Sequence, residues 1–210
     1  MKKLLPLCVL VLSLGAGQAH ASAILQIDGA GFLTGATGVM VNGTAYDVRF
    51  EAGSCNSVFN GCDPAVDLLF TTSASALAAS QALLDQVFLG DDGGIYDPFT
   101  PGFFDSHPGL TQGCTTAAFD VCLAQTPYGF SQGTLLLLGL ATNYGPFTGR
   151  TDEASLGSMV GGGTATSGIQ TFAVWSVSPV ATVPEPSTVA LLGAGLIGLV
   201  RRARRIARAQ

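Results

Sequence analysis

The feature that most constrains this chain is an uncharged apolar run near its C-terminal end, followed at once by clustered arginines. Residues 187–200 carry no charge, and five arginines lie within the next eight residues. As a helix these fourteen residues extend about 21 Å, against about 30 Å of hydrocarbon core. Such a helix spans a bilayer only where the membrane thins or flanking arginines snorkel. Because arginines stay on the cytoplasmic side, the sequence predicts a transmembrane helix over 187–200 and a basic cytoplasmic tail over 201–210, anchored by Arg201, Arg202, Arg204 and Arg205.

A proline-containing linker, residues 179–186, precedes this anchor. Pro184 and Pro186 keep the apolar helix from extending backwards, since proline lacks an amide donor and has a fixed φ. On hydropathy alone, an ordinary C-terminal anchor is the simple interpretation. However, Pro184-Glu185-Pro186, an apolar run and an arginine cluster occur here in that order, and residues 183–205 resemble the PEP-CTERM sorting signal of Gram-negative bacteria.

The resemblance implies how the chain is handled rather than what its main domain does. Proteins with this signal are exported, held transiently in the inner membrane and recognised by exosortase, a membrane enzyme expected to cut near the Pro-Glu-Pro. Pro184, Glu185 and Pro186 are then the recognition element. Exosortase and the inner membrane are the implied partners, and the cell envelope or extracellular matrix is the implied destination. The same signature is also named after ice-binding proteins, a label that describes only the tail and predicts no ice binding.

The N-terminal end predicts a secretory signal peptide over residues 1–21. A basic start and an apolar stretch over 4–14 precede Ala19-His20-Ala21, which matches the small-x-small cleavage pattern. The apolar stretch is too short to favour a retained helix. The mature chain is therefore expected to start at Ser22 or Ile24, and the region between the two terminal signals is expected outside the cytoplasm.

That region, residues 22–178, is long enough to bury its own core and predicts one extracytoplasmic domain. Its only basic residues are Arg49 and Arg150, whereas it holds thirteen of the fourteen acidic residues of the chain. Two arginines against thirteen acids give a net charge of −11. A charge of this sign excludes electrostatic binding to nucleic acid or to anionic lipid.

The cysteines agree with export. Cys8 leaves with the signal peptide, and the four that remain are expected to form disulfides in an oxidising compartment. Three connectivities are possible, and the pairs Cys55–Cys62 and Cys114–Cys122 are favoured because each encloses turn-forming residues. A four-thiolate metal site is disfavoured, because six and seven residues separate the paired cysteines where zinc sites have two to four. No metal or cofactor is predicted.

The domain is predicted to be α+β and mainly β, an antiparallel β-rich fold with one amphipathic helix over about 73–88. Alanine content, a cap at Thr72 or Ser73 and an apolar stripe indicate the helix. Asn42-Gly43 predicts a tight hairpin turn, since both residues tolerate positive φ. Residues 94–133 show no clear element and are interpreted as a binding loop or a misread strand. Strands are predicted at 24–28, 38–41, 44–51, 68–71, 134–142 and 170–178.

Little in the domain is suited to catalysis. His107 is the only histidine of the mature chain, and its turn-like neighbours indicate an exposed loop residue. The domain has no lysine for Schiff-base chemistry and no Gly-x-Ser-x-Gly elbow for a serine nucleophile. A pair of carboxylates for glycoside hydrolysis stays open, because their separation cannot be read from a sequence.

The leading hypothesis is an exported, exosortase-processed envelope or extracellular-matrix protein that is not an enzyme. The resemblance implies an association with exopolysaccharide or biofilm, because exosortase systems accompany polysaccharide export. The alternatives are a secreted polysaccharide-acting hydrolase and a carbohydrate-binding module that stacks the aromatic residues of 94–133 on sugars. A calcium site at Asp91, Asp92 and Asp97 is a further alternative, although these residues do not match the twelve-residue calcium-binding loop.

Overall fold

The computed structural model describes residues 22–63, 66–89, 103–114, 120–132, 135–160, 164–165 and 167–179. The predicted signal peptide, the Pro-Glu-Pro segment, the apolar run and the arginine tail lie outside the described residues, as do Asp91, Asp92 and Asp97. The chain divides into two compact units, Met1–Ser178 and Pro179–Gln210. No helix in the described ranges is long and apolar enough to cross a membrane.

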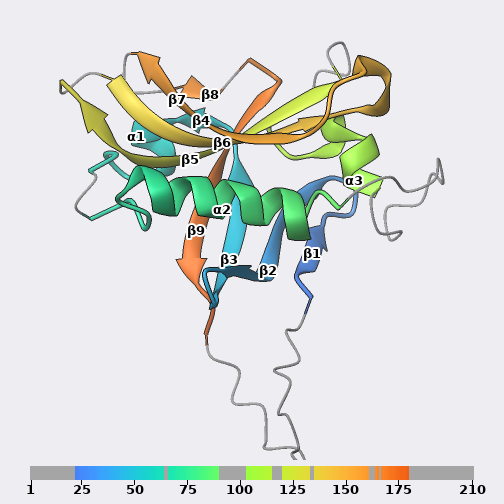
Figure 1. Ribbon diagram of the computed structural model, residues 1–210, viewed down its shortest axis with the longest axis horizontal. Helices are drawn as coiled ribbons and strands as arrows, with labels where there is room; N and C mark the ends of the chain where they lie inside the picture. The colour runs from blue at the N-terminus through green and yellow to red at the C-terminus, as the bar shows by residue number, and fades with distance from the viewer. Residues whose placement is uncertain are drawn as a thin grey trace, which may run out of the picture. The chain divides into compact units, whose positions relative to one another are not determined.

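Seven strands form the main sheet of the first unit (Figure 1). In chain order they are β1 (Ile24–Ile27), β2 (Leu33–Val41), β3 (Thr44–Glu51), β5 (Val121–Ser131), β6 (Leu135–Tyr144), β7 (Glu153–Val160) and β9 (Gln170–Val177). Their order across the sheet is β1-β2-β3-β9-β5-β6-β7. Neighbours are antiparallel except β5 and β9, which are parallel. The last strand, β9, therefore joins two antiparallel meanders into one sheet.

The β2–β3 hairpin forms because its turn residues accept left-handed backbone angles. Asn42 and Gly43 have φ of 50° and 84°, the two positive values of a type I′ turn. Along β3 the side chains alternate, with Val48 and Phe50 buried and Arg49 exposed. The turn and the alternation confirm the half-buried strand that the sequence predicts.

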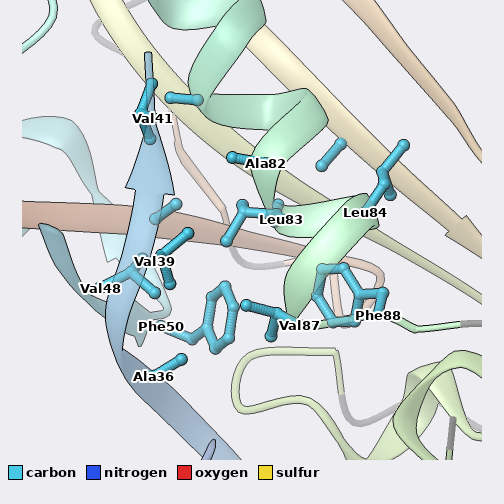
Figure 2. Close-up of a cluster of buried hydrophobic side chains, with 14 of the residues drawn as sticks. Ala36, Val39, Val41, Val48, Phe50, Ala82, Leu83, Leu84, Val87 and Phe88 are labelled. Atoms are coloured by element: carbon cyan, nitrogen blue, oxygen red, sulfur yellow. The ribbon is translucent and has the colours of Figure 1, made fainter. Parts of the chain in front are cut away.

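The helix α2 (Ser73–Gln86) crosses one face of the sheet (Figure 1). Its first turn is capped by Thr72, whose Oγ1 accepts a hydrogen bond from the Ser75 amide at 3.2 Å. Figure 2 shows the apolar side of its C-terminal half, with Leu83 and the following Val87 directed at β2 and β3. The ring of Phe88 stacks on Phe50 at a centroid distance of 5.8 Å. The predicted amphipathic helix is confirmed.

A glycine in β6 and a pair of hydrogen bonds from Gln86 hold α2 close to the sheet. A Cβ at Gly139 of β6 would lie 2.6 Å from the carbonyl oxygen of Ala76, so only glycine permits this approach. At the C-terminal end of α2, the Gln86 amide donates to the Met40 carbonyl and accepts from the Met40 amide, both at 2.8 Å. Gln86 therefore occupies the edge of β2 beyond the end of β1.

A second apolar cluster lies on the opposite face of the sheet. Leu136 and Leu138 of β6 belong to it, whereas Gly139 and Ala141 face α2, as alternation along a strand requires. The cover consists of β4 (Gly53–Ser54), α1 (Cys55–Val58) and β8 (Thr164–Ala165). The cluster contains Cys55, Phe59, Cys62, Leu68, Leu136, Leu138, Ala165 and Phe172. Burial on both faces explains the continuous apolar run from which β6 was predicted.

The structure confirms a mainly β fold with one main helix and corrects three details. Of the two interpretations of region 94–133, a binding loop or a misread strand, the second holds for the eleven-residue strand β5, whose irregular appearance comes from a β-bulge between Pro127 and Gly129. Strand β7 was missed because its edge position leaves no strong apolar pattern. Residues 68–71 form no strand; instead Leu68 and Phe70 are buried in an irregular segment.

The start of β1 and the end of β9 lie at the same position along the strand direction. Ile24 of β1 is opposite Thr37 of β2. Thr37 lies in the β2 irregularity beside Asp47 of β3, and Asp47 is opposite Ser176 of β9. Three interstrand spacings separate β1 from β9, which is about 14 Å. The domain therefore starts and finishes at one end of the sheet.

Candidate functional site

A cleft of about 500 Å³ lies between α2, α3 (Phe103–Ser106) and the connection from β6 to β7, which includes the short helix η2 (Pro146–Thr148). In Figure 1 this is the C-terminal end of α2, beside α3. Its walls combine three acidic side chains with one arginine and one tyrosine. The lining residues are Gln81, Leu84, Asp85, Phe88, Asp105, Ser106, Tyr144, Pro146, Arg150, Thr151 and Asp152.

The centre of the cleft is a pair of carboxyl groups, Asp105 and Asp152. Asp152 Oδ1 accepts a hydrogen bond from the Tyr144 amide at 2.7 Å, and the Asp105 side chain interacts with the same carboxyl group. The other oxygen, Asp152 Oδ2, is buried without a hydrogen-bond partner among the described residues. Burial raises the pKa of Asp152 above its ordinary value, and the Tyr144 amide and Asp105 offset only part of that rise.

The cleft wall beside this pair is built from Tyr144 and Arg150. The Arg150 Nη1 donates to the Tyr144 hydroxyl at 3.2 Å, and its guanidinium carbon lies 5.4 Å from the tyrosine ring centroid. This is the geometry of a cation–π contact at an exposed site. On the facing wall, Gln81 donates to Asp85 at 2.9 Å.

The positions of these side chains follow from local folding. The Gly145 amide donates to the carbonyl oxygen of Asp120 at 2.7 Å, and a Cβ at Gly145 would lie 2.0 Å from the Asp120 carboxylate. A side chain at this position would therefore displace the Asp120 carboxylate, which accepts a hydrogen bond from the Phe147 amide at 3.3 Å. Nearby, the buried Asn143 donates to the Phe104 carbonyl at 2.8 Å and fixes α3 against β6. These contacts place Asp105 opposite the β6–β7 connection.

The cleft is suited to binding a ligand rich in hydroxyl groups. It offers carboxylate acceptors, guanidinium donors and an aromatic ring within one hollow, the combination of apolar and oriented polar groups typical of binding sites. Hydrolysis of a glycosidic bond by two carboxylates needs them about 5–5.5 Å or about 6.5–9.5 Å apart, with the sugar between them. The Asp105 and Asp152 side chains interact directly instead, so no sugar fits between these two carboxyl groups. Among the described residues, no group of three His, Cys, Asp or Glu is placed to hold a metal ion.

The structure contains the two favoured disulfides, and none of their cysteines lines the cleft. Cys55 and Cys62, with Cα atoms 5.4 Å apart, close the loop that covers the second apolar cluster. Cys114 and Cys122, with Cα atoms 5.5 Å apart, connect the segment after α3 to the start of β5. Both pairs are buried and stabilise the scaffold.

Two expectations about loop residues change. His107 is half-buried rather than exposed: its ring stacks on Phe103 at 4.4 Å, and its Nδ1 lies 2.8 Å from the Phe103 carbonyl oxygen. Phe103 and Phe104 are both buried in the α2 core, because α3 packs inward. Neither ring is therefore available to stack on a sugar. Tyr96, Phe99 and Phe119 lie outside the described residues.

Sequence reasoning missed the cleft because its residues come from three distant segments. Asp85 belongs to α2 and Asp105 to α3, whereas Tyr144, Arg150 and Asp152 lie at the end of β6 and in the β6–β7 connection. None of these segments carries a motif of its own. The available signal was Arg150, one of only two arginines in an acidic domain, which is expected near carboxylates.

Comparison with known proteins identifies the C-terminal segment. Residues 182–205 match the PEP-CTERM protein-sorting motif. The chain matches no curated protein and no solved structure. The predicted recognition residues Pro184, Glu185 and Pro186 fall within the matched range, outside the described residues. The chain thus carries a PEP-CTERM sorting motif, the mark of a protein that is exported and directed to exosortase.

Proposed function

We propose that the domain is a non-enzymatic component of the cell envelope or extracellular matrix of a Gram-negative bacterium, where it binds exopolysaccharide and contributes to biofilm. The inner membrane holds it transiently until exosortase releases it. The observation that carries the binding role is the cleft, in which donors, acceptors and an aromatic ring converge.

The charge of the domain restricts the class of polysaccharide that it can bind. With thirteen acidic residues and only two arginines, the domain repels an anionic polymer at low ionic strength. A neutral polysaccharide meets no such penalty, and its hydroxyl groups can donate to Asp85 and accept from Arg150. We therefore expect a neutral rather than an acidic exopolysaccharide.

A polysaccharide hydrolase is the second candidate, favoured by the presence of several carboxyl groups in one cleft. The direct interaction between the Asp105 and Asp152 side chains argues against hydrolysis by this pair, because hydrolysis needs space for a sugar ring between the acid and its partner. The raised pKa of Asp152 is equally explained by burial in a binding cleft.

The test uses the mature exported protein and exopolysaccharide purified from the culture medium of its host. Co-sedimentation measures binding, and the release of reducing ends measures hydrolysis. We expect binding without new reducing ends; steady release of reducing ends would establish the hydrolase instead.

The arginines provide matched variants. Arg150→Ala removes the donor in the cleft and is expected to weaken polysaccharide binding about tenfold or more, the effect of one lost charge-assisted hydrogen bond. Arg49→Ala removes the only other arginine of the domain. Arg49 does not line the cleft, and its Nη2 lies 2.6 Å from the Glu51 Oε1. The Arg49→Ala protein is therefore expected to bind the polysaccharide normally. Equal loss in both variants would show that binding does not use the cleft.

A further inference from the structure

The outer edge of β7 is a long strand edge without a neighbour in the described part of the chain. Strand β7 pairs with β6 over Glu153–Val160 and is the last strand in the sheet order. The outer side of such a strand presents unpaired backbone N–H and C=O groups, a template on which another strand can form. Natural sheets usually block such an edge with charge, proline, a bulge or a covering side chain.

The opposite edge of the sheet is blocked in this way. Strand β1 has only four residues, and beyond it Gln86 occupies the backbone groups of Met40 on β2. Among the described residues, strand β7 has neither protection. Residues 154–160 contain no charge and no proline, and Leu156 is 49% exposed. The contrast indicates that the β7 edge is kept open.

We propose that the β7 edge pairs antiparallel with the β7 edge of a second copy of this chain, so that two sheets become one. A two-fold axis at Leu156 keeps equivalent side chains on the same face, since side chains alternate along a strand. The two Leu156 side chains then become cross-strand neighbours with Cβ atoms about 5 Å apart. Glu153 lies opposite Met159 of the second copy.

For contact between two copies of this chain, charge favours the β7 edge over the other surfaces of the domain. The domain is acidic overall, so most contacts between two copies would bring carboxylates together. At the β7 edge the two Glu153 residues would be six residues apart along the paired strands, about 20 Å, which exceeds the Debye length of about 8 Å. A cationic partner would instead be drawn to the acidic surfaces of the domain.

Cysteine cross-linking in the full chain, exported by its host, tests the register. All four described cysteines are paired, so an added cysteine is the reporter. Leu156→Cys is expected to form a disulfide-linked dimer on a non-reducing gel, because the two positions face each other across the axis. The control Ser158→Cys is also exposed, but its two copies would be about 14 Å apart, beyond disulfide reach. No dimer from Leu156→Cys, equal dimers from both variants, or a disulfide to another protein would overturn the proposal.

A second experiment needs no added thiol. Sedimentation equilibrium of the mature protein is expected to show a monomer–dimer equilibrium, and Leu156→Lys is expected to raise the dimer dissociation constant at least about tenfold by placing two charges at the axis. Leu69→Lys is the control, because Leu69 is similarly exposed at 42% and lies away from β7. A purely monomeric protein, or equal weakening by both substitutions, would contradict pairing through β7.

Discussion

Asp152 is a carboxyl group that burial makes harder to ionise, and it faces several other polar groups. The Asp105 side chain interacts with it, the Tyr144 amide donates to it, and Arg150 and Asp85 line the same cleft. The raised pKa means that the folded state binds a proton at Asp152 more tightly than the unfolded chain does. The stabilisation from this proton is complete below the ordinary pKa of 3.8 and is lost as pH rises through the higher folded value.

Asp152→Asn should therefore change stability in a pH-dependent way. Asparagine keeps an oxygen that can accept from the Tyr144 amide and no longer titrates. Relative to the natural protein, the free energy of unfolding of the variant should rise as the pH increases above the ordinary aspartate pKa of 3.8. Urea unfolding at several pH values measures this difference. Parallel curves for the two proteins would show that Asp152 ionises as freely in the folded state as in the unfolded chain.

At the scale of elements, the packing of α2 on β6 depends on one glycine. A Cβ at Gly139 would lie 2.6 Å from the Ala76 carbonyl oxygen and 2.8 Å from the Ser80 hydroxyl. Backbone cannot yield as a side chain end can, so the helix must move outward to admit a methyl group. That movement would loosen the contacts of α2 with its whole face of the sheet.

Gly139→Ala is therefore expected to lower the free energy of unfolding by about 1–3 kcal/mol, the usual cost of overpacking a core. Thermal or urea denaturation measures the loss. The control is Gly129→Ala in the neighbouring strand β5, where nothing lies within 4 Å of an added Cβ. If both variants lost the same stability, strand propensity rather than helix packing would be the cause.

The predictability of each element follows its local signals. The β2–β3 hairpin and α2 were predicted because Asn42-Gly43 and the Thr72 cap act within a few residues. Strand β5 was not, because Pro127 and Gly129 disrupt its pattern, and proline is tolerated inside a sheet only at a bulge. The cleft could not be predicted, since Asp105 and Asp152 meet only after the sheet has formed.

At the scale of the whole molecule, the sorting motif should decide where the protein accumulates. Replacing Pro184, Glu185 and Pro186 by alanine removes the proposed recognition element within the matched range 182–205. We expect the full-length variant to accumulate uncleaved in the inner-membrane fraction, detected by immunoblotting of fractionated cells. Alanine substitution of Pro179 and Ser178, just before the matched range, is the control and should mature normally. Unchanged maturation of the triple variant would exclude recognition through Pro-Glu-Pro.

Because β1 starts and β9 finishes at the same end of the sheet, the domain can fold while its two ends are close together. A chain that a membrane holds by both of its ends folds most easily when its first and last strands finish on the same side of the domain. Ile24 and Ser176 meet this condition, because about 14 Å separates them across the sheet. If they lay at opposite ends of an eight-residue strand such as β9, about 27 Å would separate them along the strand direction. A sheet with this topology can therefore form while both ends of the polypeptide are held at one membrane.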